Sequence, residues 1–281
     1  MRQPGPGHGR KYPSLILKVL ITGANGLIGN LVFANLAGRQ DTFEPYGSAR
    51  REQSSSRIVA NFYHIPVERM RTADLAEFDE VRTAVEGMDA VVHMAANADS
   101  YAPWAGVLRD NIIATHNVFE ASRQAGVKRV IFASTNQVVF GYRDTEPYKA
   151  LFEGRFAEVD LASYKPIVHT VPTRPTNYYA ASKVHGEALA HLYAMAHGMS
   201  GIVLRIGWVT GDDVLPQTKT FSGRHLWCSH RDIVQLVTRC LLAPATLRFD
   251  VFFGQSQNKY NLVDIQHPMD VVGYAPQDGA P

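Results

Sequence analysis

Short apolar runs alternate with longer, partly polar segments along most of this chain. Apolar runs of about four to eight residues predict buried strands, and the segments of about ten to fifteen residues between them predict helices. We expect strands at residues 18–22, 43–48, 67–74, 90–95, 129–135 and 201–206. We expect helices at residues 30–36, 77–85, 111–124 and 179–198. This alternation predicts an α/β fold with a doubly wound parallel sheet.

The regular alternation is interrupted in three places. Residues 144–176 are polar and contain prolines, so we expect an excursion outside the core. After Gly207 the alternation weakens, and residues 208–281 are expected to form a small C-terminal lobe over the carboxyl edge of the sheet. Residues 1–14 are rich in Pro and Gly, which is typical of a flexible leader.

The composition, with 46% hydrophobic and 19% charged residues, is that of a soluble globular protein. The 281 residues suffice for one large domain with a small lobe. Scattered Lys and Arg argue against nucleic-acid binding, and no apolar run could span a membrane. Cys228 and Cys240 lack metal-ligand spacing and are typical of free thiols in a reducing compartment. We therefore expect a cytoplasmic protein without a metal site.

A glycine-rich turn, Thr22-Gly-Ala-Asn-Gly-Leu-Ile-Gly29, joins the first predicted strand to the first helix. Glycines at 23, 26 and 29 allow a tight turn, close approach to a pyrophosphate and close helix packing. The free N–H groups of the helix N-terminus then favour the phosphates. The alternative is a structural turn without a ligand. The context predicts a dinucleotide-binding Rossmann-type domain at residues 15–207, with Asn25, Leu27 and Ile28 also at the cofactor.

The end of the second strand indicates which cofactor is bound. An acidic residue at this position bonds the 2′-hydroxyl of NAD, whereas arginine accommodates the 2′-phosphate of NADP. Here Ser48, Arg50 and Arg51 follow a weak strand that contains Pro45, and no acid occupies the tip. NADP is therefore slightly favoured over NAD, the alternative being a solvated basic loop. Further cofactor contacts are expected from Asp74, Leu75, Ala95, Ala96 and Ile206.

Tyr179 and Lys183 lie four residues apart in the predicted helix 179–198, so both face the same side about 5.4 Å apart. A nearby ammonium stabilises phenolate and lowers a tyrosine pKa from about 10. Tyr179 could then serve as a general acid or base. By itself the pair is weak evidence, because a surface helix can carry the same spacing by chance.

These motifs, together with Asp74-Leu75, His93-Met-Ala-Ala96, Asn111 and Ser134-Thr135, resemble the extended short-chain dehydrogenase/reductases, also called the NAD-dependent epimerase/dehydratase family. Segments such as Arg174-Pro-Thr-Asn-Tyr-Tyr179 are further similar to uronate dehydrogenases and to archaeal sugar dehydrogenases that oxidise glucose 6-phosphate. The resemblance implies hydride transfer between a sugar carbon and nicotinamide. It implies that Tyr179 is the acid/base, that Lys183 bonds the nicotinamide ribose, that Thr135 holds the substrate oxygen and that Asn111 supports a proton-relay water.

The chain departs from these dehydrogenases where they bind sugar. Gln137 stands in place of a histidine, Trp208 in place of a serine, and Ser222 in place of an arginine that Arg224 could replace. We expect substrate contacts from Ser100, Thr135, Asn136, Gln137, Trp208 and Arg224. Trp208 has the alternative of packing, and Ser134 and His93 are expected to be structural.

Three classes of function fit these residues. The first is a dehydrogenase that uses free NAD(P) on a sugar or sugar acid. The second is a nucleotide-sugar 4-epimerase or dehydratase with tightly bound NAD, against which the short C-terminal segment argues. The third is a non-catalytic NAD(P)-sensing protein, against which the intact Thr135, Tyr179 and Lys183 argue. The resemblance also implies a homodimer formed by the helices near Asn111 and Tyr179.

Overall fold

A computed structural model describes residues 16–59, 61–215 and 223–281 of the chain. The leader expected at residues 1–14 lies outside the described residues, as does Ser222. Within the described ranges, no helix is both long enough and apolar enough to cross a membrane.

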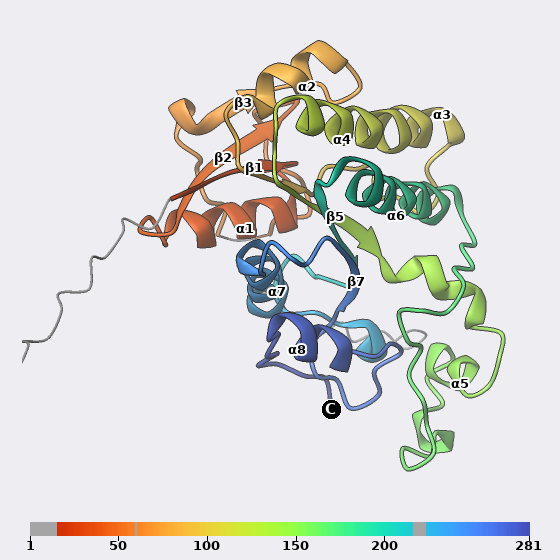
Figure 1. Cartoon of the computed structure of the whole chain (residues 1–281). Helices are drawn as coiled ribbons and strands as arrows, with labels where there is room; N and C mark the ends of the chain where they lie inside the picture. The colour runs from red at the N-terminus through yellow and green to blue at the C-terminus, as the bar shows by residue number, and fades with distance from the viewer. Residues whose placement is uncertain (1–15, 60, 216–222) are drawn as a thin grey trace, which may run out of the picture.

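A seven-stranded parallel sheet forms the centre of the molecule, in the order β3-β2-β1-β4-β5-β6-β7 (Figure 1). Its strands are β1 Leu17–Thr22, β2 Phe43–Ala49, β3 Met70–Thr72, β4 Ala90–His93, β5 Arg129–Thr135, β6 Ser200–Ile206 and β7 Phe249–Gly254. The predicted doubly wound parallel sheet is therefore confirmed. The chain reverses its direction of travel across the sheet between β1 and β4, and ligands of such sheets bind at the carboxyl edge beside this point.

Helices cover both faces of the sheet (Figure 1). α1 (Leu27–Ala37) and α7 (His230–Leu242) pack on one face in a buried cluster that includes Val19, Val92 and Ile131. On the other face lie α2 (Phe78–Val85), α4 (Ala114–Gln124) and α6 (Tyr178–His197). The core beneath them includes Val91, Phe119 and Phe132. Burial on both faces explains why the strands are almost continuously apolar.

Several elements differ from the sequence prediction. The predicted strand at 67–74 is a 3₁₀ turn, η1 (Val67–Arg69), followed by the short β3. Pro45 is tolerated in β2 because β3 pairs only with Gly47–Ala49. The helix expected to begin near Asn111 begins earlier, as α3 (Trp104–Val107) and a π-helical turn, η2 (Leu108–Ile113), that leads into α4.

The segment after Gly207 contributes more to the sheet than the sequence indicates. β7 pairs with β6 in parallel, and α7 packs in the same buried cluster as α1. Within the described residues of this segment, the remaining elements are η5 (Arg224–Leu226) and α8 (Gln266–Val272).

The excursion expected at 144–176 has a hydrophobic core of its own. It contains α5 (Tyr148–Phe152) and η4 (Phe156–Glu158), and η3 (Asn136–Tyr142) precedes it. Buried Leu151 and Ile167 pack in one cluster with Leu262 and Val263, and Ile167 forms a β-bridge with Val263. Two segments far apart in the sequence thus form one small hydrophobic cluster, which also contains Phe253 of β7.

Candidate active site

The glycine turn between β1 and α1 requires the absence of side chains. Gly23 has φ of +68°, and a Cβ there would lie 2.8 Å from the Ala95 Cα atom. A Cβ on Gly29 would lie 2.2 Å from the Gly23 carbonyl oxygen. Glycine at these positions lets the turn lie directly against the end of β4 and leaves the start of α1 open to an anion.

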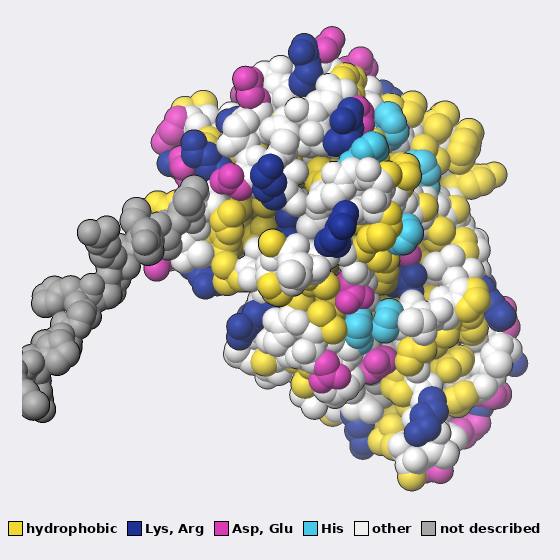
Figure 2. All heavy atoms as spheres, in the orientation of Figure 1, with side chains coloured by type: hydrophobic (Ala, Val, Ile, Leu, Met, Phe, Trp, Pro, Cys, Tyr) yellow, Lys and Arg dark blue, Asp and Glu magenta, His cyan; other side chains and the backbone are white. Residues whose placement is uncertain are grey.

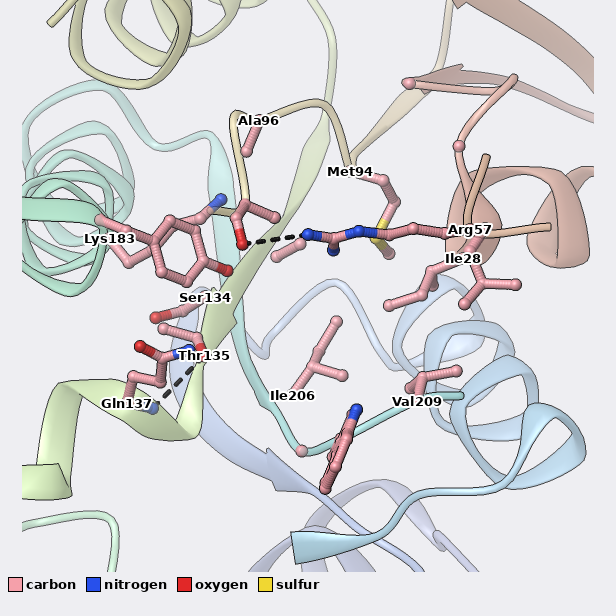
Figure 3. Close-up of a pocket in the computed structure, with 18 of the residues that line it drawn as sticks. Ile28, Arg57, Met94, Ala96, Ser134, Thr135, Gln137, Lys183, Ile206 and Val209 are labelled. Carbon is pink, nitrogen blue, oxygen red and sulfur yellow. Dashed lines mark hydrogen bonds between the residues drawn. The ribbon is translucent and has the colours of Figure 1, made fainter. Parts of the chain in front are cut away.

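A cavity of about 820 Å³ lies at the carboxyl edge of the sheet (Figure 3). It joins the glycine turn to the catalytic candidates Thr135, Tyr179 and Lys183. The other predicted site residues that line it are Gly23, Gly26, Leu27, Ile28, Gly29, Ala96, Asn136, Gln137, Ile206 and Trp208.

A smaller cavity of about 220 Å³ continues along the glycine turn, because Gly23, Gly26 and Ser55 line both cavities. It contains further residues predicted at the cofactor: Asn25, Ser48, Arg50, Arg51, Leu75 and Ala95. Four predicted site residues line neither cavity: Asp74, Ser100, Asn111 and Arg224.

Tyr179 lies in the first turn of α6, whose N-terminus is capped by Asn177. The Asn177 Oδ1 atom accepts a hydrogen bond from the Ala180 N–H at 2.7 Å. Tyr179 is only 8% exposed, and burial raises the pKa of its phenol. A hydrogen bond with Thr135 and the positive charge of Arg57 act to lower this pKa, but burial has the larger effect.

Lys183 has the spacing expected for a partner of Tyr179, with its Nζ atom 5.8 Å from the Tyr179 ring centroid. Burial lowers the pKa of the Lys183 ammonium to about 7. Near neutral pH the Lys183 side chain is therefore only partly charged. This explains why it does not offset the effect of burial on the pKa of Tyr179, although the spacing predicted a lowered pKa.

Three consecutive residues, Thr135, Asn136 and Gln137, line the large cavity at the end of β5. Thr135 ends the strand, and its Oγ1 atom accepts from the Gln137 N–H at 3.3 Å (Figure 3). Asn136 is 2% exposed, and neither its Oδ1 nor its Nδ2 atom has a hydrogen-bond partner in the described chain. The Gln137 Oε1 atom accepts from Ser100 Oγ at 3.0 Å and from Asn177 Nδ2 at 2.9 Å. Ser100 therefore reaches the site through Gln137.

Ser134 and His93 both have partners inside the protein, as expected of structural residues, although Ser134 also lines the large cavity. Ser134 donates to Glu187 Oε1 at 2.6 Å, beside the buried ion pair of Glu187 and Arg205. In the core, the two ring nitrogens of His93 meet the hydroxyls of Thr22 and Thr115 at 2.7 and 3.2 Å. Burial lowers the pKa of His93 to about 3, so the ring is neutral.

Asn111 lies in the π-helical turn and connects two parts of the site. Its Nδ2 atom donates to Ser182 Oγ at 2.9 Å and to the Asn97 carbonyl at 3.1 Å. Its Oδ1 atom accepts from the Asn97 N–H at 2.8 Å. These bonds fix the segment after β4 against α6, and the role of Asn111 in a proton relay stays a prediction.

At the adenosine end, the predicted residues are tied together by ion pairs. Asp74 accepts from Arg109 at 2.7 and 3.2 Å, and this bonding lowers the pKa of its carboxyl. Arg50 pairs with Asp110 at 3.1 Å and lies 3.8 Å from Asp74. The Oγ atom of buried Ser48 has no hydrogen-bond partner within the described chain.

Sequence reasoning missed several residues of the large cavity, including Ser55, Arg57, Met94, Asn97, Asp99, Val209 and Thr210. Except for Met94, which belongs to the strand predicted at 90–95, they lie in segments without helix or strand periodicity. Trp208 does line the cavity, and its backbone N–H donates to the Leu226 carbonyl at 2.7 Å. Leu226 lines the cavity two residues from Arg224, the residue that the sequence favoured.

No metal site was expected, yet the fold brings His169, Asp250 and His267 together, with one ligand atom of each within 4.8 Å of the others. His267 Nε2 is bonded to Asp250 Oδ1 at 2.8 Å. The two imidazoles stack 3.8 Å apart at 12°. Nearly parallel rings cannot both point a nitrogen at one ion, so shared coordination would require one ring to turn.

The fold and this cavity are those of a Rossmann-type protein, and its curated relatives are oxidoreductases. The chain belongs to the NAD dependent epimerase/dehydratase family, whose model matches residues 19–237. The NAD-dependent glucose-6-phosphate dehydrogenase of Haloferax volcanii is 30% identical, covering 93% of this chain and 94% of that protein. The uronate dehydrogenase of Pseudomonas putida is 31% identical, covering 94% and 85%. A mutant uronate dehydrogenase from Agrobacterium tumefaciens, solved with NAD, is 26% identical with a TM-score of 0.70 over 94% and 86%.

Proposed function

We propose that this protein is an NAD(P)-dependent sugar dehydrogenase that oxidises a CH–OH group of a sugar or sugar acid, or reduces the matching carbonyl. The observation that carries this proposal is the single cavity that connects the glycine turn to Thr135, Tyr179 and Lys183. The sugar dehydrogenases among its relatives support the same class of substrate.

The residues present fit a dinucleotide. The backbone cradle at Gly23 and Gly29 would be filled by a Cβ atom, and the buried Ser48 hydroxyl has no partner within the described chain. The glycine turn would hold the pyrophosphate, and Lys183 the nicotinamide ribose. When bound, nicotinamide supplies the hydride acceptor in oxidation and the hydride donor in reduction.

Tyr179 handles the proton that accompanies the hydride. In oxidation, Tyr179 as phenolate takes the hydroxyl proton while the carbon loses its hydride, and a carbonyl forms. In reduction, the phenol returns that proton. Burial raises the pKa of Tyr179, so the side chain stays protonated as reduction requires, whereas a protonated Lys183 favours the phenolate that oxidation requires. Thr135, bonded to Tyr179, would hold the reacting oxygen.

The sugar hydroxyls would bind to Asn136, Gln137 and Ser100, with Trp208 as a wall. The surroundings of Asn136 give the strongest support for sugar binding here. Its two buried amide atoms lack hydrogen-bond partners in the described chain, which costs free energy until a ligand bonds to them. Gln137 is already engaged by Ser100 and Asn177, so it would act as part of a fixed polar wall.

The family and its relatives support NAD(H) as a cofactor. We propose in addition a preference for NADP, because Ser48, Arg50 and Arg51 line the smaller cavity and its lining has no acidic side chain. Steady-state kinetics with NAD and NADP test this. A kcat/KM for NADP that exceeds that for NAD, and a reversed preference in Arg50→Ala/Arg51→Ala, would support it, whereas a preference for NAD in the unaltered protein would refute it.

A screen of uronic acids, aldoses and sugar phosphates with each cofactor tests the reaction. Reduced cofactor formed with at least one sugar is expected. Denaturing freshly purified protein and assaying the supernatant for released NAD distinguishes the epimerase alternative: stoichiometric NAD together with no net sugar oxidation would favour that alternative over the proposed function.

A homodimer through α4 and α6 belongs to the same proposal. These helices lie side by side (Figure 1), and Ile113, Leu192 and Met195 are among the exposed hydrophobic side chains around them. Figure 2 shows apolar side chains gathered at the upper right, where Figure 1 draws α3 and the neighbouring ends of α4 and α6. Light scattering should give twice the chain mass, and Leu192→Glu/Met195→Glu should give the monomer mass.

A cytoplasmic location is supported by the two buried free thiols, Cys228 and Cys240.

A further inference from the structure

The segment 51–58, which we name the strap, crosses the glycine turn and is held to it by Asn25. The Asn25 Nδ2 atom donates to the carbonyls of Arg51 at 2.7 Å and Glu52 at 3.1 Å. In return, the Ser55 N–H donates to the Asn25 carbonyl at 2.8 Å. A turn that is expected to hold a pyrophosphate therefore also fixes the position of the strap.

The other end of the strap lies against the segment that follows β6. A Cβ on Gly211 would lie 2.2 Å from the Arg57 carbonyl oxygen, so glycine allows the two backbones to touch. Both Gly211 and Arg57 line the large cavity. The strap thus contacts the glycine turn through Asn25 and the segment after β6 at Gly211, which holds the backbone of Arg57 in place.

The side chain of Arg57 extends from the strap into the cavity, near Ile28 and Met94 (Figure 3). Its Nη2 atom donates to the Ala98 carbonyl at 3.3 Å. A guanidinium has five N–H donors, and one long bond to a neutral carbonyl uses only one of them. In the described part of the chain, no carboxylate lies within ion-pair distance of Arg57, although Asp99 lines the same cavity.

Three other arginines of this region, Arg50, Arg109 and Arg205, differ from Arg57 in this respect. Arg50 and Arg109 pair with Asp74 and Asp110, and Arg205 pairs with Glu187. Arg57 instead presents its cationic fork to the space between the glycine turn and Tyr179, where its charge opposes part of the rise that burial causes in the pKa of Tyr179. A planar fork in this position matches two oxygens of one anionic group.

We propose that Arg57 is the anion-binding residue of this cavity and that it exchanges the Ala98 carbonyl for two oxygens of a phosphate or carboxylate. The anion could come from an acidic sugar or from the cofactor pyrophosphate, which share this chemistry. The inference rests on the proposed function, since it names the charged group that the same cavity receives. It also explains how the chain could bind an anionic sugar although Arg224 lies outside the cavity lining.

The test compares Arg57→Met, which keeps the length and removes the charge, with Arg57→Lys and with the control Arg82→Met on exposed α2. Binding of NAD, ADP-ribose and adenosine is measured by calorimetry, without turnover. Then kcat/KM is measured for galacturonate, glucose 6-phosphate and the neutral sugar galactose. Thermal unfolding verifies that each variant is folded.

If the substrate supplies the anion, kcat/KM of Arg57→Met falls about 10- to 100-fold for the acidic sugar alone, and Arg57→Lys recovers part of it. If the cofactor supplies it, Kd for NAD and ADP-ribose rises about as much, while Kd for adenosine is unchanged. The inference would be overturned if Arg57→Met is folded and changes neither kcat/KM for the acidic sugar nor Kd for NAD and ADP-ribose by more than twofold. Failure of the unaltered protein to oxidise any sugar would refute the proposed function, yet the ADP-ribose measurement would still report on Arg57.

Discussion

The Nζ atom of Lys183 lies 4.9 Å from the ring centroid of Phe132, in a fully buried position beneath α6. An aromatic face attracts a cation, but the surroundings do not replace the water that an ammonium loses on burial. The result is the lowered pKa of Lys183, about 7. A buried lysine of this kind should make the folded protein less stable than a buried apolar side chain would.

Lys183→Met should therefore raise the free energy of unfolding, and the gain should depend on pH. Between about pH 7 and the ordinary lysine value of 10.5, the unfolded chain holds the Lys183 proton and the folded chain does not. Unfolding then takes up a proton, so stability of the unaltered protein rises with pH across this window. Urea unfolding of nucleotide-stripped protein at pH 6.5, 8 and 9.5 should show that Lys183→Met exceeds the unaltered protein in free energy of unfolding by less and less as the pH rises. A constant difference would contradict a lowered pKa.

Tyr179→Phe should lower turnover about 10²- to 10⁴-fold, the usual contribution of a general acid or base. Removing one hydroxyl preserves the packing of a ring that is 8% exposed, so the Kd for cofactor should stay within about twofold. The neighbouring Tyr178, which is 58% exposed, provides the matched control, and Tyr178→Phe should retain activity. Full turnover by Tyr179→Phe would remove this residue from the mechanism.

Glu187→Ala should strongly destabilise the protein. It leaves Arg205 buried without its bonds of 2.7 and 2.9 Å and removes the acceptor of Ser134. An uncompensated buried charge of this kind costs about 3–5 kcal/mol. Asp79, which is 88% exposed and pairs with Arg82, is the control, and Asp79→Ala should cost less than about 1 kcal/mol. Equal losses in urea unfolding would mean that the Glu187–Arg205 pair adds nothing beyond a surface pair.

The parts of the fold and site that could be predicted from sequence are those that local patterns encode. The glycine turn is set by steric limits at Gly23 and Gly29, and the faces of α6 follow from helix periodicity, so Tyr179 and Lys183 could be placed in advance. β7 could not be predicted because the strand–helix alternation weakens after Gly207. Arg57 was missed because the strap has no period, and its place depends on bonds with Asn25 that only the fold reveals.

Local patterns also could not foresee which polar groups the fold would already have paired. Asp74 has the position expected for an adenine contact, but Arg109 occupies its carboxylate. Asn111 has a recognisable place in the sequence, but the π-helical turn directs its amide to Asn97 and Ser182. Such pairings depend on distances between segments far apart in the chain, which periodicity does not contain.

A substitution at Asn136 should separate an effect on substrate binding from an effect on the stability of the protein. Its two amide atoms are buried and lack hydrogen-bond partners in the described chain, and burying an unpaired amide costs about 1–3 kcal/mol. Asn136→Leu, which nearly preserves the shape, should therefore keep or raise the free energy of unfolding. The same variant should lower kcat/KM for the sugar about 10-fold or more, because a sugar hydroxyl loses its partner.

Asn177→Leu is the contrasting control for Asn136→Leu. Asn177 has partners at both ends of its amide, Ala180 and Gln137, and caps α6. Its loss should cost about 1 kcal/mol of stability. Urea unfolding and steady-state kinetics on both variants decide the matter. If Asn136→Leu were destabilised as much as Asn177→Leu, its amide would already be satisfied without substrate, and the lower activity would report folding rather than recognition of a sugar hydroxyl.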